Sequence, residues 1–170
     1  SSLDALGAHT MISGSGLFSL RLPDTCFLID DSTTPEFLAL YGIEYDDAVS
    51  FLDEALAQGA AGDVICRADF GASLTITVDP DAGMKQSEMA EKEEELYIDG
   101  AVADESFSYE GIVTVGEGQD LFYLVRIEHN GYTELGFTTY HDATGASITF
   151  SFAGLNDAEA KTILETLVML

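Results

Sequence analysis

Basic residues are scarce in this chain. It has six Lys and Arg and 31 Asp and Glu in 170 residues, which gives a formal net charge of −25. Such a charge repels polyanions over long range, and the basic residues are scattered rather than clustered into a stripe. This excludes nucleic acid as a ligand and disfavours direct binding to anionic lipid. Solubility alone is the favoured explanation of the charge, and the partners that would fit it are cations or a basic or cell-envelope protein.

Cysteine is also scarce, since Cys26 and Cys66 are the only two. Neither lies in a CxxC motif or a Cys/His cluster, which argues against a metal site built on sulfur. Two buried, reduced thiols are the favoured interpretation. A disulfide that closes a long loop is the alternative, which the sequence leaves open.

The chain lacks an apolar run long enough to span a membrane, and it lacks a basic-then-apolar signal peptide. It begins at Ser1-Ser2 without Met, so we expect that a leader or lipid anchor was removed and that the protein is extracellular or at the cell surface. A hydrophobic content of 46% suits one compact domain over 1–170, with 1–7 as a flexible N-terminal remnant.

Catalytic and cofactor motifs are absent as well. Gly14-Ser15-Gly16 and Gly116-Glu117-Gly118 begin like phosphate-binding loops, but neither completes the G-x-G-x-x-G pattern, and Glu117 would repel phosphate. No G-x-S-x-G elbow occurs. We therefore assign no catalytic residue and no cofactor, and we expect both glycine pairs to form turns.

The carboxylates offer weak metal candidates at most. Asp79 and Asp81 open a segment that begins like a calcium loop, but Pro80 stiffens it and Ala90 stands where the twelfth-position glutamate is needed. With so many acids, chance pairs are expected. We assign no metal site and keep Asp79 and Asp81 as the only candidates.

Three histidines are present: His9, His129 and His141. The hairpin described below separates His129 from His141 by about 30 Å along the sheet, so they cannot share a metal or a proton relay. We expect solvent-facing histidines at strand ends.

An amphipathic segment predicts a helix over 156–170. Asn156 can cap it with its side-chain oxygen, and Glu159, three residues later, completes a capping box. Apolar residues recur in the i, i+3, i+4, i+7, i+8 pattern of one buried stripe, which we expect to pack on a sheet. The stripe consists of Ala160, Ile163, Leu164, Leu167 and Val168.

Four consecutive strands are predicted before that helix. Asn130-Gly131 suits a two-residue type I′ turn, in which both central residues need positive φ. It would join strands 121–129 and 132–141 with His129 opposite Tyr132. Strand 121–129 is apolar on both sides and should be central and covered on both faces. The other strands are 107–115 and 146–152, the latter alternating between apolar residues and Ser or Thr.

The first half of the chain combines short strands and two helices. Thr34-Pro35 predicts a helix start, with the threonine as cap and the proline in the first turn. A second helix is predicted over 46–58 by apolar residues in helical register, with Gly59 as its end. The predicted strands are 9–13, 17–22, 27–29, 64–70 and 74–78.

An acidic run covers residues 86–99 and is relieved only by Lys92. It predicts a solvated helix with a thin apolar edge of Met89, Leu96 and Tyr97. Like charges at helical spacing weaken such a helix, so a mobile segment is the alternative.

Three features carry a family resemblance: the early strand Leu17–Leu22 before Pro23, the helix 46–58 leading into the hairpin 64–78, and the strand 148–152 before the last helix. Over nearly the whole chain, the order of elements resembles the PsbP-like superfamily, which includes PsbP and the Ran-binding Mog protein. The resemblance implies an α+β fold, an antiparallel sheet with helices on both faces (an α/β/α sandwich), and a C-terminal helix packed on the sheet. It also implies a protein that binds or assists others rather than catalysing, and bacterial relatives of this kind are often exported proteins of unknown role. It carries over no functional residue.

The sequence is compatible with three classes of function: a binding module, an enzyme and an adhesive domain. We favour a non-enzymatic exported or cell-surface module that binds a partner or assists assembly. The first alternative is a hydrolase-like enzyme, which requires two or more converging, buried carboxylates in a pocket. The second is a calcium-dependent adhesive domain.

Overall fold

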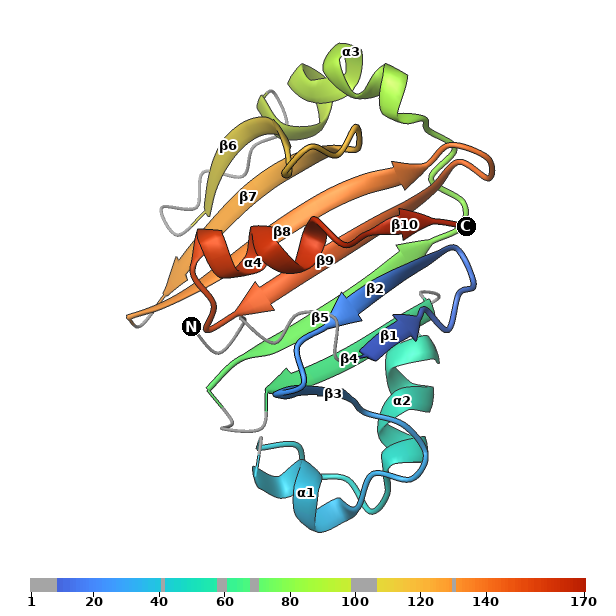
Figure 1. Ribbon diagram of the computed structural model, residues 1–170, viewed down its shortest axis with the longest axis vertical. Helices are drawn as coiled ribbons and strands as arrows, with labels where there is room; N and C mark the ends of the chain where they lie inside the picture. The colour runs from blue at the N-terminus through green and yellow to red at the C-terminus, as the bar shows by residue number, and fades with distance from the viewer. Residues whose placement is uncertain (1–8, 41, 58–60, 68–70, 99–106, 130) are drawn as a thin grey trace.

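The computed structural model describes residues 9–40, 42–57, 61–67, 71–98, 107–129 and 131–170. Their strands form two antiparallel sheets (Figure 1), one of seven strands in the order β3-β4-β5-β9-β8-β7-β6 and one of three in the order β1-β2-β10. The strands are β1 (His9–Ile12), β2 (Phe18–Leu22), β3 (Cys26–Leu28), β4 (Ala61–Arg67), β5 (Ser73–Asp79), β6 (Phe107–Thr114), β7 (Leu121–His129), β8 (Tyr132–His141), β9 (Ala146–Ala153) and β10 (Val168–Met169).

The helices are α1 (Pro35–Leu40), α2 (Ala48–Ala57), α3 (Met89–Glu93) and α4 (Asp157–Leu164). A 3₁₀ turn η2 (Gln86–Glu88) leads into α3, and a π-helical turn η3 (Glu94–Ile98) continues it. The acidic run is therefore helical, as predicted. Met89 is fully buried, whereas Leu96 is exposed rather than part of an apolar edge.

The closing meander follows its predicted pattern. The strands β7 and β8 have the predicted bounds, and His129 lies opposite Tyr132. Gly131 has φ 77°, as a tight turn needs, whereas Asn130 lies outside the described residues. In β9, Ala146, Ile148, Phe150 and Phe152 are buried, and half-buried Ser and Thr residues alternate with them. In β7, Tyr123 is buried on one face and Phe122 and Leu124 on the other, so the strand is covered on both sides.

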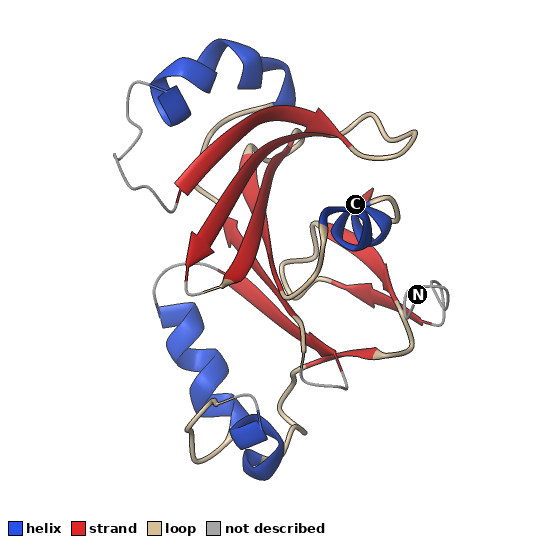
Figure 2. Cartoon of the chain, turned by 90° about the vertical axis from the view of Figure 1, so that its left-hand side faces the viewer, coloured by secondary structure: helices blue, strands red, loops and turns tan. Residues whose placement is uncertain are grey.

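One face of the seven-stranded sheet, here called the inner face, holds the main core. The three-stranded sheet and α4 lie over this face (Figure 2), and their side chains form one cluster with those of the face. Phe18 of β2, for example, meets Phe150 of β9 edge to face, with ring centroids 5.4 Å apart. The predicted single sheet is thus wrong: a second sheet, which the sequence pattern did not separate, shares this face with α4.

The opposite face, here called the outer face, is covered at its two ends. The helices α1 and α2 contribute Leu38 and Ala48 to a cluster with Cys66 of β4. At the other end, α3 contributes Met89 to a cluster with Tyr123 and Tyr140. The coarser prediction, an α+β fold with an antiparallel sheet and a C-terminal helix, is confirmed, but the cover on the two faces is unequal.

The predicted C-terminal helix is correct at its start and wrong at its end. Asn156 accepts a hydrogen bond from the N–H of Glu159, and the capping box is complete. The helix ends at Leu164, because the chain turns there, with the Thr166 hydroxyl donating to Ile163 O, and continues as β10 beside β2. Val168 is therefore exposed rather than part of a helical stripe.

The first half of the chain contains the predicted helices and strands, although β4 begins at Ala61, three residues before the start predicted for strand 64–70. Thr34 Oγ1 accepts a hydrogen bond from the N–H of Phe37 in α1. The second helix begins two residues later than predicted, where the Asp47 carboxylate accepts from the N–H of Ser50. Of the predicted boundaries, 58 and the end of strand 64–70 lie outside the described residues.

Candidate functional site

The centre of the outer face is lined by hydroxyl groups. The three adjacent strands β5, β9 and β8 place Ser and Thr side chains there in register, with Thr77 opposite Thr149 and Thr149 opposite Thr138. We call this set the hydroxyl face. It consists of Ser73, Thr75, Thr77, Thr138, Ser147, Thr149 and Ser151.

The hydroxyl face lies between the two groups of helices (Figure 2), and η3 touches its edge through the hydrogen bond between Tyr97 and Thr138. Thr75 and Thr77 are exposed, and the other members are half-buried. Thr138 Oγ1 and Thr149 Oγ1 are 3.0 Å apart and share a hydrogen bond. Strands about 4.8 Å apart, with same-face residues about 7 Å apart along each strand, make this a regular array of donors and acceptors.

A carboxylate stands at each end of this array. Asp79 lies beside Ser147, and Glu134 lies beside Ala153, which is next to Ser73. The two ends are six positions apart along β5, from Ser73 to Asp79, a length of about 20 Å. Within the described strands, this face carries no Lys or Arg, so the surface is polar and negative.

Two surface depressions that share Tyr132 and Gly154 lie at the edge of the sheet near Glu134, the first beside the hydroxyl face and the second on the side of α4. One, of about 320 Å³, is lined by the exposed side chains of Leu40 and Tyr132; the other, of about 420 Å³, extends to Arg126 and Asp157. Gly154 has φ 79°, and a Cβ there would lie 2.1 Å from the Gly71 carbonyl oxygen. Only glycine permits this close approach of the two loops.

The guanidinium of Arg126 in the second depression is neutralised by two carboxylates. Its Nε lies 2.7 Å from Glu110 Oε1, and its Nη2 lies 2.7 Å from Asp157 Oδ2. The hydrogen bond to Arg126 holds the pKa of Asp157 below its usual value, and both hydrogen bonds raise the pKa of Arg126. This depression therefore offers no uncompensated positive charge to an anion.

A tyrosine cluster borders the other end of the hydroxyl face. Tyr97 stacks on Tyr109 at 4.6 Å between ring centroids, lies 4.7 Å from Tyr123, and is hydrogen-bonded to Thr138. Burial raises the pKa of all these phenols, that of Tyr140 to about 12. They stay protonated at physiological pH and hold the acidic helix on the sheet: Tyr123 donates to Met89 O and Tyr109 to Glu93 Oε2, both in α3. Tyr97 belongs to η3 and stacks on Tyr109.

Asp79 and Asp81, the metal candidates from the sequence, lie at the end of β5. Both are exposed, and the Asp79 carboxylate accepts a hydrogen bond from the N–H of Asp81 at 2.9 Å. No third His, Cys, Asp or Glu joins them, and no such group of three occurs in the part of the chain that the structure describes. The segment is a turn closed on itself rather than an assembled set of ligands.

The histidine expectation is wrong for His141. This residue is buried; its Nε2 donates to the carbonyl oxygen of Leu170 at 2.7 Å, and its Nδ1 lies 2.9 Å from Thr144 Oγ1. His9 is exposed as expected, and the side chain of His129 lies outside the described residues. His141 thus joins β8 to the segment after β10, a long-range contact with no sequence signal.

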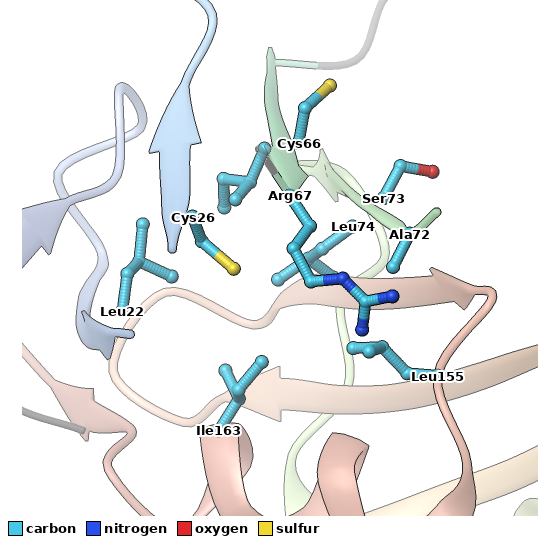
Figure 3. A pocket seen from close by; sticks show the side chains of 10 residues that line it. Leu22, Cys26, Cys66, Arg67, Ala72, Ser73, Leu74, Leu155 and Ile163 are labelled. Atoms are coloured by element: carbon cyan, nitrogen blue, oxygen red, sulfur yellow. The ribbon is translucent and has the colours of Figure 1, made fainter. Parts of the chain in front are cut away.

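The two cysteines are buried and are not joined by a disulfide. Cys26 lies opposite Arg67 and Cys66 opposite Phe27 on the paired strands, so their side chains point to opposite faces of the sheet. Figure 3 shows Cys26 directed into a small cavity and Cys66 directed away from it. That cavity has a volume of about 10 Å³ and an almost wholly apolar lining, room for one water-sized sphere but not for a ligand.

Asp63 is the buried carboxylate among the described acids. Its Oδ2 accepts from the Ser13 hydroxyl at 2.7 Å, and its Oδ1 accepts from the N–H of Gly14 at 3.0 Å. It therefore secures the turn between β1 and β2 to β4. The converging pair of buried carboxylates that a hydrolase site requires does not occur within the described residues.

The fold and this surface define an α+β protein with an antiparallel sheet whose outer face is open, rich in hydroxyls and acidic at both ends. No protein-family model and no curated protein matches the chain. Over 96% of its length it is similar to a crystal structure from Bacteroides thetaiotaomicron VPI-5482, with 12% identity and a TM-score of 0.52, and it spans 49% of that protein. At this identity the similarity concerns the fold alone. No described helix combines the length and apolar character that a membrane crossing requires.

Proposed function

We propose that this protein is a non-enzymatic, exported or cell-surface binding or assembly module that holds a basic, extended segment of a partner protein on its hydroxyl face. The observation that carries the proposal is the array of exposed and half-buried hydroxyls on three central strands, with Asp79 and Glu134 at its ends.

The hydroxyls suit a polypeptide partner. Each Ser or Thr hydroxyl can donate and accept, so the array can pair with both the N–H and the C=O groups of an extended backbone. The residues sit on strands that are hydrogen-bonded on both sides, so little conformational entropy is lost when a partner binds. The exposed Leu40 and Tyr132 at one end add apolar contact area.

The net negative charge of the protein favours a basic segment of the partner. A chain of net charge −25 attracts cations at long range, and the carboxylates of Asp79 and Glu134 can each receive a Lys or Arg of the partner. Their separation along the strand direction, about 20 Å, corresponds to about six residues of extended chain. A partner with basic residues six positions apart and small polar residues between them fits this spacing.

Isothermal titration calorimetry tests the proposal. The probe is a capped seven-residue peptide with Lys at both ends and Ser, Thr and Gly between, compared with the same peptide carrying Glu at both ends. We expect the Lys peptide to bind and the Glu peptide not to bind. Asp79→Asn combined with Glu134→Gln should weaken the Lys peptide about tenfold, equivalent to about 1.4 kcal/mol.

Three threonine substitutions, two on the hydroxyl face and one control, test the contribution of the hydroxyls separately from that of charge. Thr77→Val and Thr149→Val remove hydroxyls on the face, whereas Thr114→Val removes an exposed hydroxyl at the end of β6. The first two should weaken binding several-fold and the third should not. Equal affinity for the two peptides, or equal effects of the three substitutions, would rule out this surface.

We also propose that the architecture is that of the PsbP-like superfamily, an α/β/α sandwich. The order of elements supports this assignment, as does the placement of α4 opposite the group of α1, α2 and α3. Superposition of an experimental structure on PsbP tests it. An alignment restricted to the β6–β9 meander, with the helices displaced, contradicts it.

A further inference from the structure

The outward face of the three-stranded sheet is a second surface, and its composition differs from that of the hydroxyl face. Ile12 and Val168 both lie beside Ser19, one on each side, so the three form a row across the sheet. Leu170 follows Val168 on the same face, and its N–H donates to the Leu17 carbonyl oxygen. We call this set the terminal-sheet face. It consists of Thr10, Ile12, Ser19, Arg21, Val168 and Leu170.

Exposed apolar residues are concentrated here. Seven large apolar side chains are exposed among the described residues, and three of them share this one small face. Ile12 is 66% exposed, Val168 54% and Leu170 57%. Single exposed apolar residues are ordinary, but neighbours of this kind mark surfaces that dock another molecule.

Acidic residues are missing from the same place. The strands β1, β2 and β10 contain no Asp or Glu, although 31 of the 170 residues of the chain are acidic. Depletion of charge with retention of apolar side chains is the composition of an interface centre. The one charged side chain of the terminal-sheet face, Arg21, lies one row away from Ile12 and Val168.

We propose that the terminal-sheet face docks the same face of a second copy of this chain. Two copies that each carry a charge of −25 repel one another wherever acidic surfaces meet, so an acid-free face is where they can approach. A two-fold axis through this face brings the two apolar rows together and closes the assembly as a dimer. Arg21 then lies toward the rim, where the acidic surroundings of the other copy favour its charge.

Sedimentation velocity over a range of concentrations tests the proposal on the whole chain. We expect a monomer–dimer equilibrium that shifts toward dimer when NaCl rises from 50 mM to 500 mM, because salt screens the repulsion and leaves the apolar contact intact. Ile12→Glu and Val168→Glu should each weaken dimerisation at least tenfold, because each places a carboxylate in the apolar row.

Val49→Glu is the matched control. Val49 is 46% exposed on α2, on the other side of the seven-stranded sheet, so this substitution adds the same charge and should leave the equilibrium unchanged. Circular dichroism melts verify that each variant is folded. A wild-type chain that stays monomeric at all salt concentrations overturns the proposal, as do equal effects of all three substitutions. Because the terminal-sheet face is separate from the hydroxyl face, Lys-peptide binding should persist in the monomeric variants.

Discussion

Single buried or half-buried polar residues hold distant parts of this protein together. Asp63 links β4 to the turn after β1, and Gln86 accepts from the N–H of Leu121 while its amide nitrogen donates to Asp120 Oδ1 and the Tyr140 carbonyl oxygen. Each contact spans more than 30 residues of sequence. Such side chains carry no local pattern, so their roles follow from the tertiary structure alone.

His141 is the clearest case, because the sequence predicts it on the surface and the structure buries it. We expect His141→Ala to lower the free energy of unfolding by about 2–4 kcal/mol, since it removes two hydrogen bonds and leaves a cavity beside Leu170. Urea denaturation followed by circular dichroism measures this. His9→Ala, at an exposed position, should change stability by less than about 0.5 kcal/mol.

At the scale of elements, local sequence signals placed most helices and strands correctly. The capping box of Asn156 and Glu159 marks the start of α4, and the alternation in β9 marks a strand with one buried side. Local sequence signals do not predict where α4 ends. Leu167 and Val168 continue a helical rhythm, but pairing of β10 with β2 outcompetes the helix there.

The first turn of α4 supplies a pH-dependent contribution to stability. Asp157 has a folded-state pKa below its unfolded value of about 3.9, chiefly because of its hydrogen bond to Arg126. A depressed carboxylate pKa stabilises the fold above the unfolded pKa, and the contribution is lost as pH falls through the folded pKa. We expect the stability difference between wild type and Asp157→Asn to be present at pH 6 and to shrink steadily below about pH 4.

Urea midpoints measured from pH 6 down to pH 2 test this. Asp53→Asn, on the exposed surface of α2, is the control and should differ little from wild type at each pH. A constant difference between wild type and Asp157→Asn across this range would contradict the assignment to the Arg126 contact.

At the scale of the whole molecule, charge is the dominant property. A net charge of −25 on 170 residues destabilises the compact state through self-repulsion, and salt screens that repulsion. We expect the urea midpoint to rise when NaCl increases from 20 mM to 500 mM.

Calcium provides the matched comparison for that experiment. At equal ionic strength, CaCl₂ should stabilise no more than the general effect of a divalent counter-ion, which MgCl₂ measures, because Asp79 and Asp81 have no third ligand among the described residues. A urea midpoint that is well above the magnesium value at micromolar calcium would instead indicate a specific calcium site. It would support the alternative of a calcium-dependent adhesive domain.

The sequence predicts one part of the candidate site, and only the structure shows the other part. The alternation of Ser and Thr with apolar residues in β5 and β9 is visible in the sequence and marks one polar side of each strand. That these sides belong to adjacent strands, and that α2 and α3 flank them without covering them, follows only from the order β5-β9-β8 and the placement of the helices.

By itself, the sequence determined the charge, most of the secondary structure and the hairpin register, because these depend on residue type and short-range periodicity. The tertiary structure decided the second sheet, the exposure of Val168, the burial of His141 and the separation of Cys26 from Cys66 onto opposite faces. The physical reason is that strand pairing joins residues far apart in the chain, and a shift of one residue in that pairing changes the face on which a side chain lies.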